Sequence, residues 1–328
     1  MKKLCPTIIF AVFMALALPA YADQDAKEMF KAVVKIRATV PKDARTAATL
    51  GTEREGYGIV IDSKGHILTI GYLIVEADTL EVIGPDDKVI GGTFVGYDHN
   101  TGLGLLRSDK PLNVVPVKLG RSSEVKEGDP VLVAGHGGPE AAGAARVISR
   151  KEFAGYWEYL LEDAIFTLPA YPDFGGAALI NRDGQLVGIG SLLTQVMIPG
   201  VGSIACNIFV PIDLLQPILT DLITVGRPRK APRPWLGLNV EEAHGRVFVM
   251  RVTSGGPAEQ AGLKPDDLIL TVNGKPVSGL ADFYRKVWAL GNAGVDVSLS
   301  ILKGTEIRNI TLHSVDRYQF LQLKQKKT

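Results

Sequence analysis

The stretch YPDFGGAALINRDGQLVGIGS, residues 171–191, has the pattern of a buried loop, a turn at Asn181–Gly184 and a strand. A loop of this kind could hold a nucleophile for acyl transfer. That reaction needs a hydroxyl or thiol, a base with a pKa near neutrality and an acid that orients the base. Between Thr167 and Ser191, however, the chain has no serine, threonine or cysteine. The candidate loop therefore lacks the residue types that attack a carbonyl carbon.

Other reactive side chains are few. Cys206 lies in the apolar stretch SIACNIFVP and is expected to be buried and inert. Ser191 follows a strand that reads as buried, so a structural role is expected for it. His66, His99 and His136 are too irregularly spaced for a ligand motif and are expected to be ordinary hydrogen-bonded residues. The sequence therefore predicts no metal and no cofactor.

The first residues are typical of a secretory signal. Lys2 and Lys3 precede an almost wholly apolar run at 8–18, and Ala20-Tyr21-Ala22 offers small residues where a signal peptidase reads the chain. We expect residues 1–22 to be a signal peptide cleaved after Ala22. The apolar run is too short for a good membrane span, and no later segment is long and apolar enough to cross a bilayer. The mature protein is expected to be soluble and exported.

Length and charge narrow the remaining possibilities. About 300 residues follow the predicted signal, which is the length of two or three domains. The formal net charge of the full chain is only +1, which argues against nucleic acid or an anionic membrane as the main partner. Cys206 is the one cysteine of the mature chain, so no internal disulfide is expected.

Short β-branched and alternating runs separated by turn signals fill the first two thirds of the chain. Many short strands at such spacing predict an all-β barrel or sandwich. Helical apolar spacing appears once, at 213–226, and ends at Gly226. The predicted strand segments are 33–40, 57–70, 79–98, 103–108, 129–137 and 184–193.

A change of composition divides the chain. GRPRKAPRP, residues 226–234, has three prolines and four basic residues and is expected to be a stiff, solvated linker. It separates a first domain at 23–225 from a second, compact unit at 235–317. The basic, amphiphilic stretch 318–328 is expected to be a frayed or packed tail.

Five ordered blocks resemble the HtrA/DegP-type trypsin-like serine proteases. They match that family's histidine block, aspartate block, following strand, serine block and closing helix, and with the second unit the resemblance covers about the whole mature chain. It implies a mainly β fold, a trypsin-like double six-stranded β-barrel. The blocks are residues 56–78, 95–109, 119–137, 171–189 and 210–226.

The residue types at the positions that carry catalysis in that family are different in this sequence. Tyr72 stands in the histidine place, Gly102 in the aspartate place and Gly175 in the serine place, and sliding the last block by one residue would put Phe174 there. A tyrosine, with a pKa of about 10, is a poor base at neutral pH, and glycine offers no nucleophile. Asp173 replaces a glycine of the oxyanion loop, where a carboxylate pointing inward would oppose the developing charge. The resemblance thus predicts no intact catalytic residue.

The second unit resembles a PDZ domain of the bacterial, permuted type, an α+β fold. The signature is GPAEQAGLKPDD at 256–267, followed by Val272-Asn273-Gly274. Pro257 is expected to start a short helix, Gly262 to end it, and Asn273-Gly274 to form a tight hairpin.

PDZ domains bind an extended peptide by adding it as a strand to a sheet edge. By resemblance, a loop receives the terminal carboxylate on its backbone N–H groups, the next strand is the receiving edge, and two residues of a helix face the groove. For the two helix residues, packing in the domain core is an equal alternative. The loop is Trp235, Leu236, Gly237 and Leu238, the edge is Leu238, Asn239 and Val240, and the helix residues are Phe283 and Val287.

Three functions follow from these features. The first is an exported HtrA-like pseudoprotease of the periplasm that binds peptides or unfolded envelope proteins, as a scaffold, a chaperone-like factor or a regulator of active family members, with a trimer implied by resemblance. The alternative is an active serine endopeptidase of periplasmic protein quality control. The third, a small-ligand or metal-binding protein that uses the former cleft, has no positive support. Tyr72, Gly102 and Gly175 favour the first.

Overall fold

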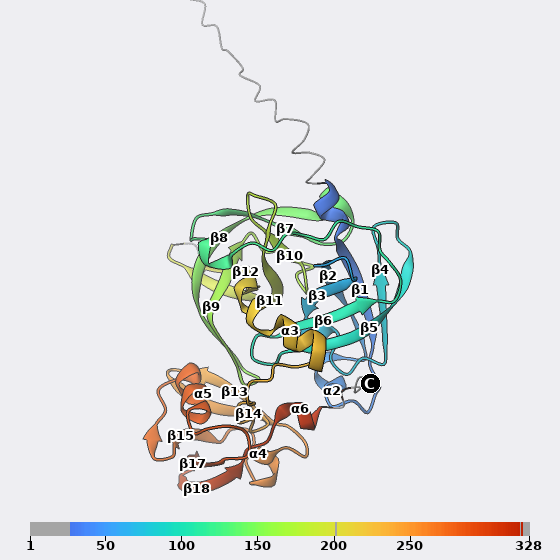
Figure 1. Ribbon diagram of the computed structural model, residues 1–328. Coiled ribbons are helices and arrows are strands. Elements are labelled where there is room, and N and C mark those ends of the chain that lie inside the picture. Colours follow the sequence, from blue (N-terminus) through green and yellow to red (C-terminus); the bar gives the residue numbers. More distant parts are fainter. Residues whose placement is uncertain (1–26, 201, 322, 324–328) are drawn as a thin grey trace, which may run out of the picture.

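The computed structural model describes residues 27–200, 202–321 and 323. The predicted signal peptide, residues 1–22, and most of the basic tail lie outside the described residues. Two β-barrels are followed by a third unit that lies below them in Figure 1, coloured orange to red. None of the described helices has the length and apolar character needed to cross a membrane.

The first barrel is closed by six strands in the order β1-β2-β3-β6-β5-β4. β1 alternates buried and partly exposed residues, whereas β3 is buried along its whole length because both of its faces are covered. A short 3-10 helix, η1 (Gly71–Leu73), follows β3 directly. The strands are β1 (Val33–Thr39), β2 (Glu53–Val60), β3 (His66–Ile70), β4 (Thr79–Ile83), β5 (Val89–Tyr97) and β6 (Leu103–Ser108), with helix α2 (Ala47–Leu50) between β1 and β2.

The second barrel is also closed by six strands, in the order β10-β11-β12-β9-β8-β7. The predicted double six-stranded barrel is therefore confirmed. The strands of the first barrel, β7 and β11 lie where strands are predicted, whereas β8, β9, β10 and β12 lie outside the predicted segments. The strands are β7 (Pro130–Ala134), β8 (Ala142–Gly155), β9 (Tyr159–Leu168), β10 (Ala178–Ile180), β11 (Leu186–Ile198) and β12 (Gly202–Pro211), with η2 (Ser122–Glu124) and η3 (Gly138–Ala141) in the connections.

The predicted helix at 213–226 is formed by η4 (Ile212–Leu214) and α3 (Gln216–Val225). Gly226 has a φ of 80°, the left-handed conformation that ends many helices, and its N–H donates to the carbonyls of Asp221 and Leu222. The predicted end at Gly226 is thus confirmed.

The third unit is a six-stranded sheet with the path β13-β14-β15-β17-β18 and β16 paired to β15. Asn273 and Gly274 have φ values of 46° and 74° and connect β15 to β16, so the predicted hairpin is confirmed. Gly262, with φ 82°, follows α4 as expected. The elements are β13 (Leu238–Ala243), β14 (Arg246–Val252), α4 (Pro257–Gln260), β15 (Leu268–Val272), β16 (Lys275–Pro276), α5 (Leu280–Trp288), β17 (Asp296–Lys303), β18 (Glu306–His313) and α6 (Arg317–Phe320).

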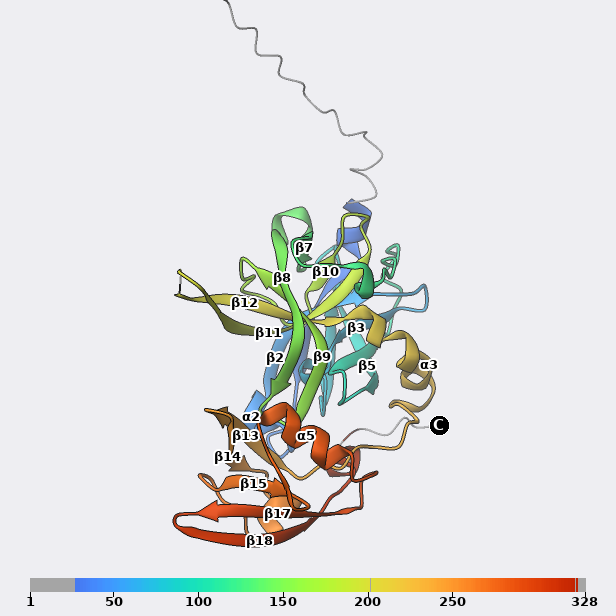
Figure 2. The same ribbon diagram turned by 90° about the vertical axis from the view of Figure 1, so that its left-hand side faces the viewer.

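The β8–β9 hairpin joins the second barrel to this sheet. Figure 2 shows it running down from the barrel toward β13 and α5. Leu160, in β9, is buried in the same apolar cluster as Phe283 and Val287 of α5. A barrel residue thus completes the core of the C-terminal unit.

The described start of the tail packs back onto the molecule. The ring of Phe320 lies 4.7 Å from that of Trp235. The Tyr318 hydroxyl accepts a hydrogen bond from the His99 N–H at 3.0 Å and donates to the Tyr97 carbonyl at 3.2 Å. The segment α6 therefore ties the C-terminal unit to the first barrel.

Replacing Tyr318 with phenylalanine is expected to lower the free energy of unfolding by about 1–3 kcal/mol, because the His99 N–H loses its partner in a part-buried place. Urea denaturation of the wild type and the variant measures this difference. Tyr156→Phe removes the same hydroxyl from a side chain that is 52% exposed and serves as the matched control. Equal effects at both positions would show that the Tyr318 contacts do not stabilise the fold.

Candidate functional site

The structure brings Tyr72 and Gly175 together between the two barrels. Tyr72 lies in η1, directly after β3, and Gly175 lies in the loop between β9 and β10. The Tyr72 hydroxyl is 3.0 Å from the point where a Cβ would stand on Gly175. The phenol thus occupies the space that a side chain at residue 175 would enter.

Tyr72 also links one barrel to the other through a hydrogen bond. Its hydroxyl donates a hydrogen bond to the carbonyl of Ser191 at 3.1 Å, across 119 residues of sequence. Ser191 sits at an irregularity of the β11–β12 ladder, between Gly190 and Leu192. Burial raises the pKa of Tyr72 well above its ordinary value, so the hydroxyl stays protonated at neutral pH and cannot serve as a base.

The loop around Gly175 is packed tightly against β2. The Gly175 carbonyl accepts from the Tyr57 N–H at 2.8 Å, and a Cβ on Gly176, whose φ is 76°, would lie 2.0 Å from the Tyr57 carbonyl oxygen. Asp173 is exposed and Phe174 is half-buried. Burial, with the charge of Asp173 as the second cause, raises the pKa of Tyr57 to about 12. The surroundings of Gly175 therefore consist of backbone groups and the phenol of Tyr57, and not of an acid paired with a base.

Gly102 lies in a turn that is stabilised by hydrogen bonds between residues of the turn. Its φ is +77°, a conformation that residues with a side chain rarely adopt, and a Cβ there would lie 3.2 Å from the Tyr159 hydroxyl. Its carbonyl accepts from the Gly71 N–H at 2.6 Å. The buried carboxylate of Asp98 accepts from the N–H of Thr101 at 3.0 Å. Asp98 thus stabilises the turn through a local hydrogen bond.

The other reactive residues lie apart from one another and have separate partners. His66 Nδ1 is 2.6 Å from an Asp62 carboxylate oxygen, and His136 Nε2 is 2.9 Å from the Gly84 carbonyl. Burial lowers the pKa of His99 well below its ordinary value and raises that of the Cys206 thiol. Among residues 27–200, 202–321 and 323, no three His, Cys, Asp or Glu side chains are grouped so that they could hold a metal ion.

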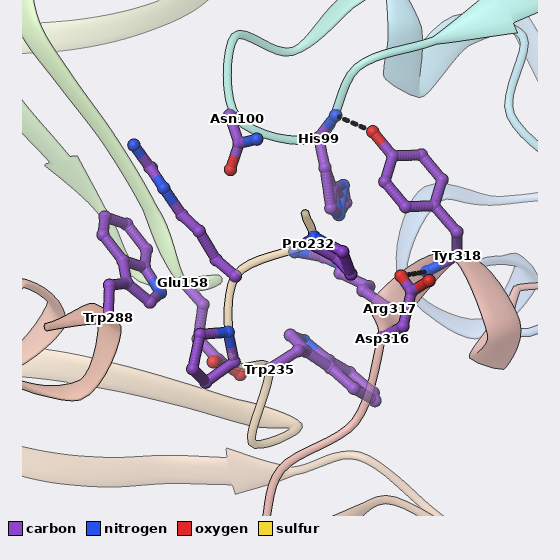
Figure 3. A pocket seen from close by; sticks show the side chains of 11 residues that line it. His99, Asn100, Glu158, Pro232, Trp235, Trp288, Asp316, Arg317 and Tyr318 are labelled. Carbon is purple, nitrogen blue, oxygen red and sulfur yellow. Dashed lines mark hydrogen bonds between the residues drawn. The ribbon is translucent and has the colours of Figure 1, made fainter. Parts of the chain in front are cut away.

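The backbone amides of Leu236, Gly237 and Leu238 converge on one carboxylate. This is the chemistry that the sequence predicts for the loop, but the carboxylate is that of Glu158 in the β8–β9 turn. One carboxylate oxygen, Oε1, accepts from Gly237 at 2.8 Å and from Leu238 at 2.9 Å. The other, Oε2, accepts from Leu236 at 3.0 Å. Figure 3 shows Glu158 beside Trp235, with its carboxylate directed toward this loop.

The rest of the turn lies between β13 and α5. The carbonyl of Tyr156 accepts from the N–H of Val240 at 2.8 Å, on the edge where a peptide is expected to add. The Tyr284 hydroxyl donates to the Gly155 carbonyl at 2.7 Å and accepts from the Glu158 N–H at 3.1 Å. Residues 155–158 thus contact both walls of the predicted groove.

The remaining groove residues divide between core and edge. Phe283 and Val287 are buried with Leu160, so they contribute to the core cluster that the hairpin completes. Asn239 is half-buried and pairs with Arg251 in the β13–β14 ladder. These positions are consistent with both interpretations of the helix residues, as groove wall and as core.

Glu158 was missed by sequence reasoning. It is 8% exposed, and its φ of 57° is unusual for a residue with a side chain. Burial raises the pKa of Glu158 to about 7, although the amides of the loop and the charge of Arg317 lower it. The sequence did contain a signal, because Glu158 stands between aromatic residues in Tyr-Trp-Glu-Tyr. Burying a carboxylate in such a turn is unfavourable unless hydrogen-bond donors contact it.

A small cavity of about 30 Å³ lies beside this contact, between the first barrel, the linker and the C-terminal unit. That volume corresponds to roughly one water molecule and not to a metabolite. The cavity is far from large enough to argue for a small-molecule site. Its lining includes His99, Glu158, Trp235, Trp288, Arg317 and Tyr318.

Both parts of the chain match known protein families. Residues 56–189 match the trypsin-like peptidase domain, and residues 234–313 match the PDZ domain. The chain is 28% identical over 290 residues to a Pseudomonas fluorescens protein named "Probable periplasmic serine endoprotease DegP-like", which covers 83% of this chain and 58% of that protein. It is 24% identical over 273 residues to the Escherichia coli periplasmic serine endoprotease DegP, covering 78% of this chain and 56% of DegP. The chain thus spans a little over half the length of these relatives.

Solved structures show the same fold. The HtrA-type protease AlgW with a decapeptide has a TM-score of 0.53 and 22% sequence identity, over 90% of this chain and 98% of that chain. The serine endoprotease from Yersinia pestis has a TM-score of 0.52 and 22% identity, over 91% of this chain and 99% of that chain. At this identity the likeness concerns the fold alone.

Introducing a serine at residue 175 is not expected to create a peptidase. We expect no casein hydrolysis from Gly175→Ser, nor from the triple variant that also carries Tyr72→His and Gly102→Asp. In Gly175→Ser the added Cβ would lie 3.0 Å from the Tyr72 hydroxyl. In the triple variant, the aspartate introduced in place of Gly102 would need a left-handed conformation that costs about 1–2 kcal/mol. Release of dye from labelled casein measures hydrolysis.

Gly175→Ala is the control for the added Cβ, and it should destabilise the protein as much as Gly175→Ser does. Hydrolysis by the triple variant at a rate above that of Gly175→Ala would show that the backbone still holds a working geometry.

The free energy of unfolding is expected to fall as pH rises through the pKa of the Glu158 carboxyl, because burial favours its protonated form. Its pKa is about 7 in the folded protein and near 4.5 when exposed, so the stabilisation is complete below about pH 4.5 and is lost as pH rises to about 7. At about 1.4 kcal/mol per pKa unit, the change amounts to about 3 kcal/mol. The charge of Arg317 acts on the same carboxylate, and the Tyr284 phenol, whose pKa burial raises, faces it as a neutral group.

Urea denaturation of the wild type and Glu158→Gln at several pH values between 5 and 8 tests this expectation. The difference between the two proteins should shrink or reverse with rising pH, because glutamine does not titrate. A pH-independent difference would show that the carboxylate is ionised throughout.

Proposed function

We propose that this chain, which matches a trypsin-like peptidase domain and a PDZ domain, is an exported pseudoprotease of the HtrA/DegP type that binds peptides. Its work is recognition in the periplasm, as a scaffold, a chaperone-like factor or a regulator of active proteases. The proposal rests on the resemblance for the catalytic places, which assigns Tyr72, Gly102 and Gly175 to them. A fold can persist where its original chemistry has been lost.

The observation that carries the proposal is the contact between Tyr72 and Gly175. A triad needs a hydroxyl nucleophile beside an unprotonated base. Here the base position holds a buried phenol bonded to the Ser191 carbonyl, and the nucleophile position has no side chain. A side chain at residue 175 would crowd the Tyr72 hydroxyl, and this hydroxyl already donates to the Ser191 carbonyl.

The binding half of the proposal rests on the C-terminal unit. Three amides of Leu236, Gly237 and Leu238 point to one carboxylate, which is how backbone donors recognise a peptide C-terminus. Buried apolar residues, among them Phe283 and Val287, lie beside this loop. Peptides or unfolded chains with a free carboxylate and an apolar end are the expected ligands.

Location and assembly are parts of the same proposal. The basic and apolar start of the chain and the periplasmic names of the relatives support export to the periplasm, with the signal peptide cleaved after Ala22. An oligomer, a trimer by resemblance to the family, is proposed, and active proteases of the same family are candidate partners.

The alternative is an active serine endopeptidase of periplasmic protein quality control. The names of the relatives favour it, since those proteins are described as endoproteases. It would require a nucleophile other than residue 175, because Gly175 has no side chain. The phenol of Tyr72 does not meet the requirement, as its raised pKa keeps it protonated.

Two measurements on the purified protein, residues 23–328, test the proposal. Labelled casein should not be cleaved above the level of a heat-inactivated sample, and a pool of peptides with free C-terminal carboxylates should bind saturably. The same peptides with amidated C-termini are the control and should bind at least about tenfold more weakly, because charge-assisted hydrogen bonds are lost.

Casein cleavage that co-elutes with the protein and survives both Gly175→Ser and Tyr72→Phe would reveal an unforeseen nucleophile and overturn the proposal. Binding that does not distinguish the free from the amidated peptides would overturn its recognition half.

A further inference from the structure

We infer that the PDZ groove is closed by an internal ligand, the turn at residues 155–158, whose Glu158 carboxylate takes the place of a peptide C-terminus. The inference rests on the proposed function, in that it concerns control of the proposed peptide site. An external peptide would bind only after the turn has withdrawn.

The first part of the groove that the turn occupies is the carboxylate-binding loop, Leu236 to Leu238. Both oxygens of Glu158 accept hydrogen bonds, and the N–H groups of Leu236, Gly237 and Leu238 are all used. A peptide carboxylate needs the same donors. Two carboxylates in one loop would repel each other, so the internal and external ligands exclude one another.

The sheet edge is the second part. Strand addition relies on main-chain donors of β13, and the N–H of Val240 is already bonded to the Tyr156 carbonyl at 2.8 Å. The apolar part is the third, since Leu160 is buried among the residues of the C-terminal core, including Phe283 and Val287. The hairpin thus satisfies the carboxylate loop, the edge and the apolar wall together.

Contacts outside the groove hold the turn in place. The Tyr284 hydroxyl bonds both the Gly155 carbonyl and the Glu158 N–H. Arg317 donates to the Trp157 carbonyl at 3.1 Å, and Glu152 of β8 forms an ion pair with Arg285 of α5. The closed arrangement is therefore a built contact and not an incidental touch of two surfaces.

The same arrangement contains features that oppose closure. Glu158 has a left-handed φ of 57°, and its carboxylate is withdrawn from water. A linear peptide brings a carboxylate to the loop without this strained turn. Since an apparent dissociation constant equals the intrinsic one divided by the open fraction, any change that weakens closure strengthens peptide binding.

The protein supplies its own reporter for this test. Its three tryptophans all lie at this junction: Trp157 in the turn, Trp235 in the loop and Trp288 in α5. Intrinsic fluorescence of the full chain therefore reports on the contact without a label. Hydrogen exchange of the amides of residues 236–240 reports on closure directly, even when no peptide is present.

The experiment compares the wild type with Glu158→Gln and Glu158→Ala, using the pool of peptides with free C-terminal carboxylates as the probe. Both variants should bind the pool at least about tenfold more tightly than the wild type does, and exchange at residues 236–240 should rise by a similar factor. Glu162→Gln removes an exposed carboxylate from β9 of the same hairpin and should change neither value by more than about twofold. Tyr284→Phe, which removes the clamping hydroxyl, should act in the same direction as Glu158→Gln if Glu158→Ala fails to fold.

The outcomes separate the inference from the proposed function. Equal affinity and equal exchange in the wild type and the Glu158 variants, with amidated peptides still rejected, would overturn the internal ligand and leave peptide recognition standing. Faster exchange in the variants without binding of any peptide would confirm the closed turn and overturn the proposed function. Tighter binding with faster exchange supports both.

Discussion

A carboxylate that is taken out of water must be met by donors, and this requirement determines how the two halves of the protein meet. Glu158 is at the tip of a barrel hairpin, yet its partners are backbone N–H groups of the C-terminal unit. Without them the buried charge would be costly. The hairpin, the loop Leu236–Leu238 and the helix α5 are therefore mutually dependent. Removing any one of them leaves polar groups of another unsatisfied.

A continuous series of contacts runs from this carboxylate to the cleft between the barrels. Tyr159, the next residue, donates its hydroxyl to the Thr101 carbonyl at 2.7 Å. The turn of Thr101 and Gly102 is bonded to Gly71 through the Gly102 carbonyl at 2.6 Å, and Tyr72 follows. Proximity alone does not establish energetic coupling. Tyr159 nevertheless connects the hairpin directly to the turn that holds Gly102.

Much of the fold could be predicted because it follows local patterns. The turn signals and alternating runs predict most barrel strands, and Gly226 and Asn273-Gly274 end or reverse elements through their backbone conformation. β8 escaped prediction because it carries charged residues along a strand that leaves the barrel. Its burial pattern mixes exposed and partly buried positions over 14 residues, so no period of two stands out.

The site could be predicted only in part, for a related reason. Resemblance places Tyr72 and Gly175 in facing blocks, and the structure brings them together. It also predicts that the amides of Leu236–Leu238 receive a carboxylate. The source of that carboxylate could not be predicted, since Glu158 lies 78 to 80 residues away and no local rule connects a hairpin tip with a loop of another unit.

The three residues of the cleft are best understood as one packing arrangement. Tyr72 reaches the Ser191 carbonyl because nothing projects from Gly175. Gly102 can hold its φ of +77° beneath the Tyr159 hydroxyl because it too has no side chain. Each glycine makes room for a tyrosine hydroxyl, and each hydroxyl bonds a backbone carbonyl of another segment. A Cβ added at Gly175 or Gly102 would lie 3.0 or 3.2 Å from a tyrosine hydroxyl, so a tyrosine that joins separate parts of the fold would have to shift.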